Sequence, residues 1–334
     1  MVSKHDASRP VRGLGLCSGG LDSILAALVL KKQAVEVTWI TFVTPFFGAE
    51  KARRAARLTG IPLIEKDITE PYLKMLRNPP AGYGQHMNPC MDCHTMMFRM
   101  AGEIMEAEQY DFLFSGEVLG QRPMSQTRPS LRYVEKHSGY DGHILRPLSA
   151  RRLPETLVEQ KGLVDRSRLL DLAGRSRKPQ IRLAKEYGIQ KYPAPAGGCL
   201  LTDKQFSRRL GDLLEHDPQP PPRFLHLLRY GRHFRVDATT KIIVGRNSSE
   251  NRQILEYVDP AKDTTLKTIE YPGPLAVLPG GAIPPARQLA AALCAGYSKA
   301  PPEAMVRVSV RNAGEKTSLS VLAVAPEDLH HLLI

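Results

Sequence analysis

Three cysteines have the residue type and spacing of groups that bind metals or transfer sulfur. Cys90 and Cys93 form a Cys-x-x-Cys pair, which is both a natural chelate and a redox pair, and Cys199 follows two glycines. Thiolates select soft metals such as zinc, copper(I) or the iron of iron–sulfur clusters. From the pair alone, zinc, a disulfide and an inert pair all stay open. The total of five cysteines is odd, which argues against a disulfide framework.

The six residues Ser18-Gly-Gly-Leu-Asp-Ser23 could hold a phosphate group. Gly19 and Gly20 allow a tight turn in which backbone N–H groups approach an anion. The helix expected to follow adds free N–H donors and the positive end of its dipole, and Ser18 and Ser23 add hydroxyls. The string has neither the Walker form nor the Gly-x-Gly-x-x-Gly form. A plain serine-capped junction is the alternative.

The elements that must position these groups alternate along the N-terminal part of the chain. Apolar runs predict strands at 11–16, 35–43, 62–68 and 111–115, and helical spacing predicts helices at 21–32, 49–59 and 95–107. Strands separated by helices predict a parallel sheet with helices on both faces, and such sheets bind ligands beyond the C-terminal ends of their strands. Ser18–Ser23 and Ser115–Gln126 both fall there.

We expect an α/β protein of three parts. Residues 1–150 form the nucleotide-binding domain, 151–215 a basic helical region that carries Cys199, and 216–334 a small α+β domain. Four prolines among residues 218–222 cannot lie inside a helix and indicate a boundary. Beyond them, residues 233–244 predict a hairpin, and 305–311 and 318–324 alternate as strands do.

Composition and charge indicate a globular protein with a polyanionic partner. Of 334 residues, 42% are hydrophobic and 24% charged, with a net charge of +12. Eleven basic and five acidic residues fall between 151 and 191. This favours nucleic acid, although a solvated helical face is the plain alternative. The longest apolar run near the start has seven residues, too few to span a membrane, and no secretory signal is evident, so we expect a soluble cytoplasmic protein.

Ser18-Gly-Gly-Leu-Asp-Ser23 resembles the signature of the PP-loop ATPases, also called N-type ATP pyrophosphatases. These enzymes cleave ATP between the α and β phosphates and adenylate a carbonyl oxygen. The resemblance implies that Gly19, Gly20 and Ser23 hold the pyrophosphate end, and that Asp22 assists catalysis through Mg²⁺ or by orienting the loop. The strand that contains Thr41 and Phe42 would border the adenine.

Both cysteine segments resemble those of the tRNA thiolation branch of these ATPases. Asn88-Pro-Cys-x-x-Cys93 is similar to the first cysteine segment of that branch, and Ala196–Asp203 is similar to the second. In the iron–sulfur members of that branch, three cysteines bind a 4Fe–4S cluster whose fourth iron takes a sulfide. The resemblance therefore implies a cluster on Cys90, Cys93 and Cys199. A persulfide and disulfide relay is the alternative. A structural zinc ion with His94 as its fourth ligand is a further alternative, but the adjacent residues Cys93 and His94 would form a strained chelate.

Ser115–Gln126 resembles the Gly-Asp/Glu-x-x-Gly-Gln segment of the tRNA 4-thiouridine synthases. In that setting Glu117 and Arg122 could bind Mg²⁺ and phosphate, whereas in an ordinary helix cap Glu117 would face solvent. Arg235–Asn247 resembles the RNA-binding segment of the NFACT family. The ATP-binding residues implied by these resemblances are Ser18, Gly19, Gly20, Leu21, Asp22, Ser23, Thr41, Phe42, Gly116, Gly120 and Gln121.

Together the resemblances imply an ATP-dependent tRNA sulfurtransferase that thiolates a uridine and releases AMP and pyrophosphate. Cys90, Cys93, Cys199 and Asp22 would be its catalytic residues. ATP, Mg²⁺ and a 4Fe–4S cluster would be its cofactors. Its partners would be tRNA and a sulfur donor, either sulfide or a persulfide from a cysteine desulfurase, with no membrane. A PP-loop enzyme acting on a small molecule and a non-catalytic RNA-binding protein are the alternatives.

Overall fold

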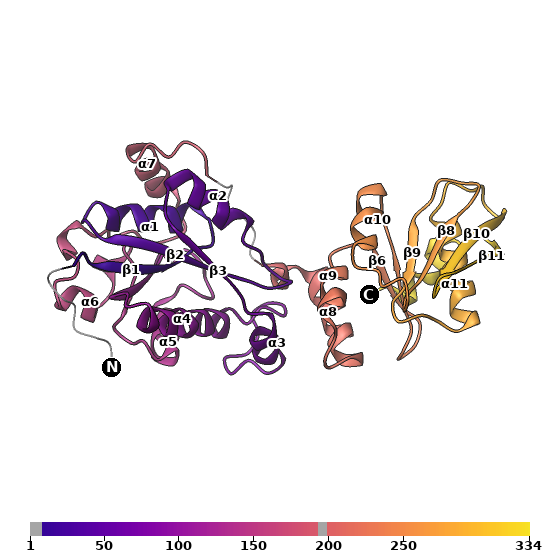
Figure 1. Cartoon of the computed structure of the whole chain (residues 1–334), viewed down its shortest axis with the longest axis horizontal. Coiled ribbons are helices and arrows are strands. Elements are labelled where there is room, and N and C mark those ends of the chain that lie inside the picture. Colours follow the sequence, from indigo (N-terminus) through magenta and orange to yellow (C-terminus); the bar gives the residue numbers. More distant parts are fainter. Residues whose placement is uncertain (1–8, 193–198) are drawn as a thin grey trace. The chain divides into compact units, whose positions relative to one another are not determined.

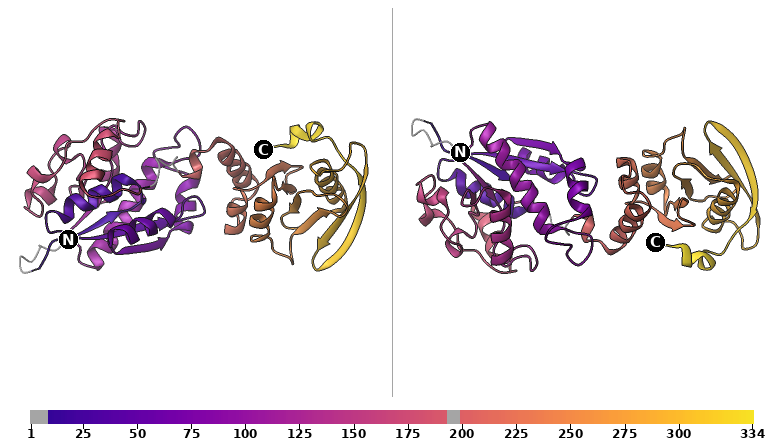
Figure 2. Two further views of the ribbon diagram at one scale, coloured as in Figure 1. Left: turned by 90° about the horizontal axis from the view of Figure 1, so that it is seen from above. Right: turned by 90° about the horizontal axis from the view of Figure 1, so that it is seen from below.

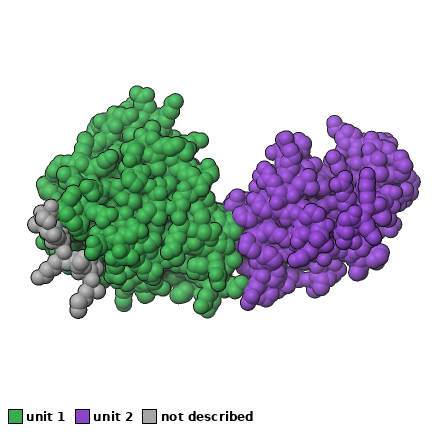
Figure 3. All heavy atoms as spheres, in the orientation of Figure 1, with its two compact units in different colours: residues 1–199 green, residues 200–334 purple. Residues whose placement is uncertain are grey.

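The structure is a computed structural model that describes residues 9–192 and 199–334. It consists of two compact units, residues 1–199 and 200–334, shown in green and purple in Figure 3. Each unit is described by itself below. The three-part division expected from the sequence, with boundaries at 150/151 and 215/216, stays a prediction.

Unit 1 is built on a five-stranded sheet in which every pairing is parallel. The strand order is β3-β2-β1-β4-β5, so the chain moves outward from β1 in one direction and then crosses to the other side at β4. The loops after β1 and β4 therefore diverge at the point where such sheets bind ligands. The strands are β1 (Arg12–Leu16), β2 (Glu36–Val43), β3 (Leu63–Asp67), β4 (Phe112–Ser115) and β5 (Ile144–Leu145).

Helices cover both faces of this sheet, which confirms the predicted α/β class. Figure 1 shows α1, α2 and α7 over one face and α3, α4 and α5 over the other. The helices are α1 (Leu21–Lys31), α2 (Glu50–Thr59), α3 (Thr69–Arg77), α4 (Cys90–Ala107), α5 (Arg128–Ser138), α6 (Leu157–Gln160) and α7 (Lys178–Glu186), with 3₁₀ turns at Ala150–Arg152 and Arg166–Arg168.

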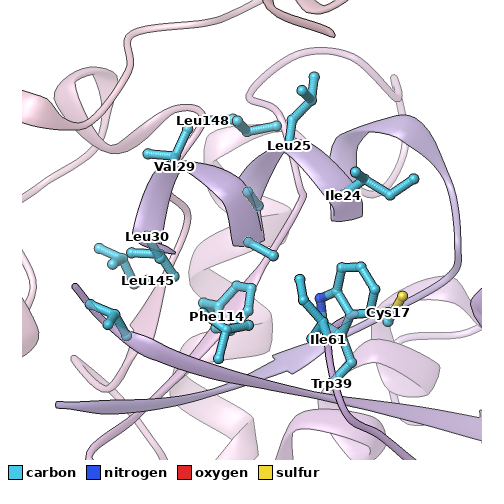
Figure 4. Close-up of a cluster of buried hydrophobic side chains, with 14 of the residues drawn as sticks. Cys17, Ile24, Leu25, Val29, Leu30, Trp39, Ile61, Phe114, Leu145 and Leu148 are labelled. Carbon is cyan, nitrogen blue, oxygen red and sulfur yellow. The ribbon is translucent and has the colours of Figure 1, made fainter. Parts of the chain in front are cut away.

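The core of unit 1 lies between α1 and the sheet. Leu25 and Leu30 of α1 pack over Trp39 of β2 and Phe114 of β4, and all four side chains are buried (Figure 4). Apolar residues dominate α1, so the helix can bury most of its surface and hold the loop before it at a fixed place beside the sheet.

Several elements differ from those predicted. α4 begins at Cys90 rather than Thr95, so both cysteines of the pair lie in its first turn. α3, α5 and β5 had no prediction. The basic region 151–202 is less helical than expected, because Pro154 and Gly174, whose φ is +86°, interrupt the pattern.

Unit 2 is a six-stranded antiparallel sheet of order β11-β10-β8-β9-β7-β6, which confirms the hairpin and strands expected there. α11 packs on one face of the sheet, and α9 and α10 lie against β7 and β9 on the other. Its elements are α8 (Lys204–His216), α9 (Pro222–Leu227), β6 (Arg232–Arg235), β7 (Lys241–Val244), α10 (Ser248–Leu255), β8 (Thr264–Thr268), β9 (Leu275–Leu278), α11 (Pro284–Gly296), β10 (Met305–Asn312) and β11 (Glu315–Leu322), with 3₁₀ turns at Leu200–Thr202 and Pro326–Leu332.

Two cysteines lie in these cores. Cys17 is buried after β1, and Cys294 is buried in α11 against the unit 2 sheet, as small apolar residues would be. No helix among residues 9–192 and 199–334 combines the length and hydrophobicity needed to cross a membrane.

Candidate active site

The two polar segments singled out in the sequence meet at one edge of the unit 1 sheet. Leu16 of β1 and Ser115 of β4 are paired residues on adjacent parallel strands. The loop that contains Ser18 and the loop that begins at Gly116 therefore leave the sheet side by side. A Cβ atom on Gly116 would lie 2.4 Å from the carbonyl carbon of Asp22 and 2.5 Å from the nitrogen of Ser23, so a side chain at position 116 would collide with the start of α1.

The loop between β1 and α1 is shaped to approach an anion. Gly19 has a φ of +70°, and a Cβ there would lie 2.1 Å from the backbone of Lys51, so the position requires glycine. The hydroxyls of Ser18 and Ser23 lie 3.1 Å apart and brace the turn. In the described structure no side chain caps α1 at Gly20, which leaves the first N–H groups of the helix available to a phosphate.

Leu21, Thr41 and Phe42, the other residues expected to bind ATP, lie at or beside this loop. The Leu21 side chain is buried in the core, so its N–H is the group that can reach a ligand. The N–H of Cys17 donates to the carbonyl of Ile40 at 2.9 Å, which holds the next residues of β2, Thr41 and Phe42, beside the loop. Both of these side chains are buried.

Asp22 lies at the centre of a chain of polar side chains. Its Oδ2 accepts a hydrogen bond of 2.7 Å from Nε2 of Gln121, and Oε1 of Gln121 accepts one of 2.9 Å from Gln180. Its buried Oδ1 has no hydrogen-bond partner within the described residues. Burial raises the pKa of Asp22, and the Gln121 hydrogen bond and the charges of Arg177 and Arg122 oppose that rise.

An unpartnered carboxylate oxygen beside a phosphate-binding turn fits Mg²⁺. This ion is commonly held by one or two carboxylates together with the phosphates of the substrate and water. Oδ1 of Asp22 is therefore the atom that would hold Mg²⁺. Glu117, the other expected candidate, is engaged elsewhere, as described below.

A basic loop within residues 151–191, a region expected to bind nucleic acid, reaches this edge of the sheet. The N–H of Gly174 donates to the carbonyl of Leu119 at 2.7 Å, and Ser149 joins the same two segments by donating to Leu172 and accepting from the N–H of Leu119. These bonds bring Arg177 and Gln180, at the start of α7, to Asp22 and Gln121. The positive charge of the run Gly174-Arg-Ser-Arg-Lys178 is evident in the sequence. Its position beside Asp22 and Gln121 is not.

The three expected sulfur residues interact with one another in unit 1. Cys90 and Cys93 lie on the first turn of α4, where Nδ2 of Asn88 donates to the sulfur of Cys90 at 3.2 Å. Burial raises the pKa of the Cys93 thiol, and the neighbouring sulfurs of Cys199 and Cys90 raise it further. The hydroxyl of Tyr72, a buried residue on α3, donates to Cys93, and burial together with these thiols raises the pKa of Tyr72. The sequence analysis missed Tyr72.

The donor set suits a soft metal or a cluster, because it consists of three thiols from two segments of the chain. Over residues 9–192 and 199–334, no three side chains of the metal-binding types are drawn together closely enough to hold an ion as they stand. Residues 193–198, which include the glycines before Cys199, lie outside the described part of the chain. No disulfide joins cysteines in the described part.

A buried ion-pair network connects the cysteine pair to the loop after β4. His94 follows Cys93, and its Nδ1 lies 2.9 Å from Oε1 of Glu117, while Oε2 of Glu117 accepts a 2.9 Å bond from Nε of Arg146. Arg146 also pairs with Glu135. Burial raises the pKa of Glu117, but the charge of Arg146 and the bond from His94 outweigh it and hold this pKa at about 2.

Glu117 is consequently an ionised, buried carboxylate whose two oxygens are both used. It neither faces solvent, as an ordinary helix cap would, nor stands open to a metal ion. The contact with Glu117 holds the imidazole of His94 in one orientation.

A parallel sheet with a glycine-rich turn after β1, an aspartate at the first turn of α1 and a second loop packed against it define unit 1 as a PP-loop α/β domain. Comparison with known families agrees. Residues 10–152 match the family described as thiamine biosynthesis protein (ThiI), and residues 231–333 match the NFACT protein RNA binding domain. Each of the two matches spans less than half of the chain.

Individual relatives are similar to part of the chain. A probable tRNA sulfurtransferase of Oceanobacillus iheyensis is 32% identical over 146 residues, which cover 41% of this chain and 34% of the relative. One of Latilactobacillus sakei is 30% identical over 132 residues, covering 37% and 31%. A crystal structure of a 4-thiouridine synthetase–RNA complex with bound ATP is 24% identical and covers 54% of this chain and 50% of that chain, with a TM-score of 0.35. The chain spans about a third of the length of the two curated relatives.

Proposed function

We propose that this protein is an ATP-dependent tRNA sulfurtransferase that replaces a carbonyl oxygen of a uridine by sulfur. The hydrogen bond between His94 and Glu117 carries the proposal. It joins the turn that holds Cys90 and Cys93 to the loop that packs on Asp22, so that the phosphate-binding turn and the sulfur residues face the same edge of one sheet. The relatives named as probable tRNA sulfurtransferases, which are 32% and 30% identical over part of the chain, support the same reaction.

The reaction needs both halves of such a site, because a uridine oxygen is a poor leaving group. The carbonyl oxygen attacks the α phosphorus of ATP, the bond to the β phosphate breaks, and pyrophosphate leaves. A sulfur nucleophile then adds to the activated carbon, and AMP departs with the original oxygen. Holding the base, the nucleotide and the sulfur in one geometry lowers the barrier of each step.

The residues of the phosphate-binding edge would divide this work. The N–H groups at the start of α1 and the hydroxyls of Ser18 and Ser23 bind the pyrophosphate end of ATP. Asp22, oriented by Gln121, holds Mg²⁺ through its unpartnered Oδ1, and Arg177 offsets the negative charge that develops on the leaving pyrophosphate. Gly116 lets the loop after β4 pack closely on the start of α1, and Gly120, with a φ of +76°, lets the same loop turn.

Cys90, Cys93 and Cys199 would carry the sulfur chemistry, and as a set of three thiols they would hold a 4Fe–4S cluster. When bound, a cluster with three protein ligands supplies an iron open to inorganic sulfide. The protein's own contribution is to bury Cys93, to orient its sulfur through the Tyr72 hydroxyl, and to fix the α4 turn through Asn88. Sulfide, or a persulfide from a cysteine desulfurase, would be the sulfur source.

The RNA partner follows from the charge and from the second unit. The net charge of +12 favours a polyanion, and residues 231–333 match the NFACT protein RNA binding domain. We therefore place the protein with tRNA in the cytoplasm, where ATP and sulfur donors are available.

The test compares C199A with wild type and with C294A as a matched control, because Cys294 lies in the core of unit 2. Each protein is prepared anaerobically and given tRNA, ATP, Mg²⁺ and sulfide, and both AMP and thiouridine are measured. We expect C294A to behave as wild type, and C199A to form no thiouridine while still binding ATP. Full thiolation by C199A would overturn the assignment. AMP release without RNA and without thiouridine would point to a small-molecule substrate instead.

A further inference from the structure

The sheet of unit 2 has one region that no helix covers. On one face, Val306, Val308 and Val310 of β10 pack against α11. On the opposite face, α9 and α10 cover only the part formed by β7 and β9, where Ile243 and Val277 are buried. Both views of Figure 2 show the β10–β11 hairpin at the outer edge of unit 2, with α11 on its inner side.

Most side chains on the uncovered part of this opposite face are polar and four are basic, while Met305 and Leu322, paired at one end of it, are apolar and exposed. Alternation along the strands places them on one surface, which we call the open face. Thr265 and Lys267 come from β8, Arg307, Ser309 and Arg311 from β10, and Lys316, Ser318 and Ser320 from β11.

Three cations of the open face have no acidic partner. Arg307 pairs with Glu270, but Lys267, Arg311 and Lys316 are exposed and make no ion pair with any described residue. Arg311 and Lys316 are moreover directly opposite each other on paired strands. Like charges in that arrangement destabilise a sheet, so the folded protein keeps them at a cost. A bound polyanion would remove that cost.

We infer that the open face of β8, β10 and β11 docks the sugar-phosphate backbone of RNA, with Lys267, Arg311 and Lys316 as phosphate ligands. This inference rests on the proposed function for the choice of RNA. The face lies within residues 231–333, which match the NFACT protein RNA binding domain. Its hydroxyls at Ser309, Ser318 and Thr265 are donors suited to phosphate and ribose oxygens, and it carries no aromatic ring on which a base could stack.

Such contacts position the RNA without reading its sequence. Neighbouring strands lie about 5 Å apart and alternate residues of a strand about 7 Å apart, so the three cations span a short stretch of backbone. Each phosphate contact contributes roughly 0.7 to 0.9 to the slope of log K against log salt. Three contacts therefore account for a slope of about two to three.

The experiment measures binding of unmodified tRNA to the full chain by fluorescence anisotropy over a range of KCl concentrations. K267A/R311A/K316A is compared with wild type and with R252A/K262A/K299A, which removes the same charge from exposed positions elsewhere on unit 2. We expect the open-face variant to bind on the order of a hundredfold more weakly at 0.1 M KCl and to lose about two to three from the slope. The control variant should stay within a few-fold of wild type.

A stability measurement separates lost docking from lost folding. Because the variant relieves the repulsion between Arg311 and Lys316, its unit 2 thermal midpoint should rise by about 2 °C rather than fall. Unchanged tRNA affinity and salt slope, or an equal loss in the control variant, would overturn the inference. Absence of thiouridine formation by wild type would count against the proposed reaction and leave the binding result intact, so the two failures are distinguishable.

Discussion

The buried pair between Glu117 and Arg146 makes a quantitative prediction for E117Q. The substitution keeps the size of the side chain and removes its charge, which leaves the guanidinium of Arg146 with Glu135 as its remaining acidic partner. It also frees His94 from the carboxylate that orients it. The variant should therefore lower the stability of unit 1 and disturb the turn that holds Cys90 and Cys93.

The magnitude follows from the pKa of Glu117. Folding lowers this pKa from its ordinary value of 4.5 to about 2. At roughly 1.4 kcal/mol per pKa unit, the ionised carboxylate contributes about 3 kcal/mol of folding stability at pH 7. Because the folded pKa is the lower one, this contribution is complete above pH 4.5 and is lost as the pH falls through 2. At pH 3 roughly half of it remains.

Urea unfolding followed by tryptophan fluorescence provides the assay, since Trp39 is the single tryptophan of the chain and is buried in unit 1. With an m value of about 2 kcal/mol per M, E117Q should lower the midpoint by about 1.5 M at pH 7 and by about half as much at pH 3. E65Q, which removes an exposed partner of Arg53, should leave the midpoint nearly unchanged. Equal midpoints for E117Q and E65Q, or a loss independent of pH, would refute the reasoning.

Two further predictions concern the phosphate-binding edge. G116A places a Cβ about 2.5 Å from the backbone of Asp22 and Ser23 and should weaken ATP binding at least tenfold by calorimetry, whereas G48A, with open space around it, should bind as wild type does. Q121A removes a hydrogen bond that lowers the pKa of Asp22. The acid limb of the pH profile of pyrophosphate release should therefore move to higher pH, and kcat/KM should fall about tenfold. Q219A, at an exposed position, should cause neither effect. Normal ATP binding by G116A, or an unmoved acid limb in Q121A, would contradict the site described here.

The α/β framework could be predicted because its signal is local. The apolar runs at 11–16 and 111–115 and the helical spacing of 21–32 follow from burial on one or two faces, and parallel strands bring their C-terminal ends to one edge. For that reason the sequence predicts that the loops of residues 18–23 and 115–126 lie close together, and the structure shows their contact at Gly116. The sequence also predicted the hairpin at 233–244.

Contacts between distant segments could not be predicted in the same way. Gln180 lies 59 residues after Gln121, and the bond from Gly174 to Leu119 helps to bring the two together. A basic run at helical spacing looks the same whether it faces solvent, tRNA or a phosphate site. Tyr72 gave no signal at all, because its place beside Cys93 depends on how α3 packs against α4.

The most direct test of the central claim is mass spectrometry of tRNA nucleosides from cells with and without this protein. We expect one thiolated uridine to be missing from the tRNA of cells that lack the protein. The wild-type chain should restore it, and C199A should not. An unchanged set of thionucleosides in cells that lack the protein would contradict the claim that the chain thiolates tRNA.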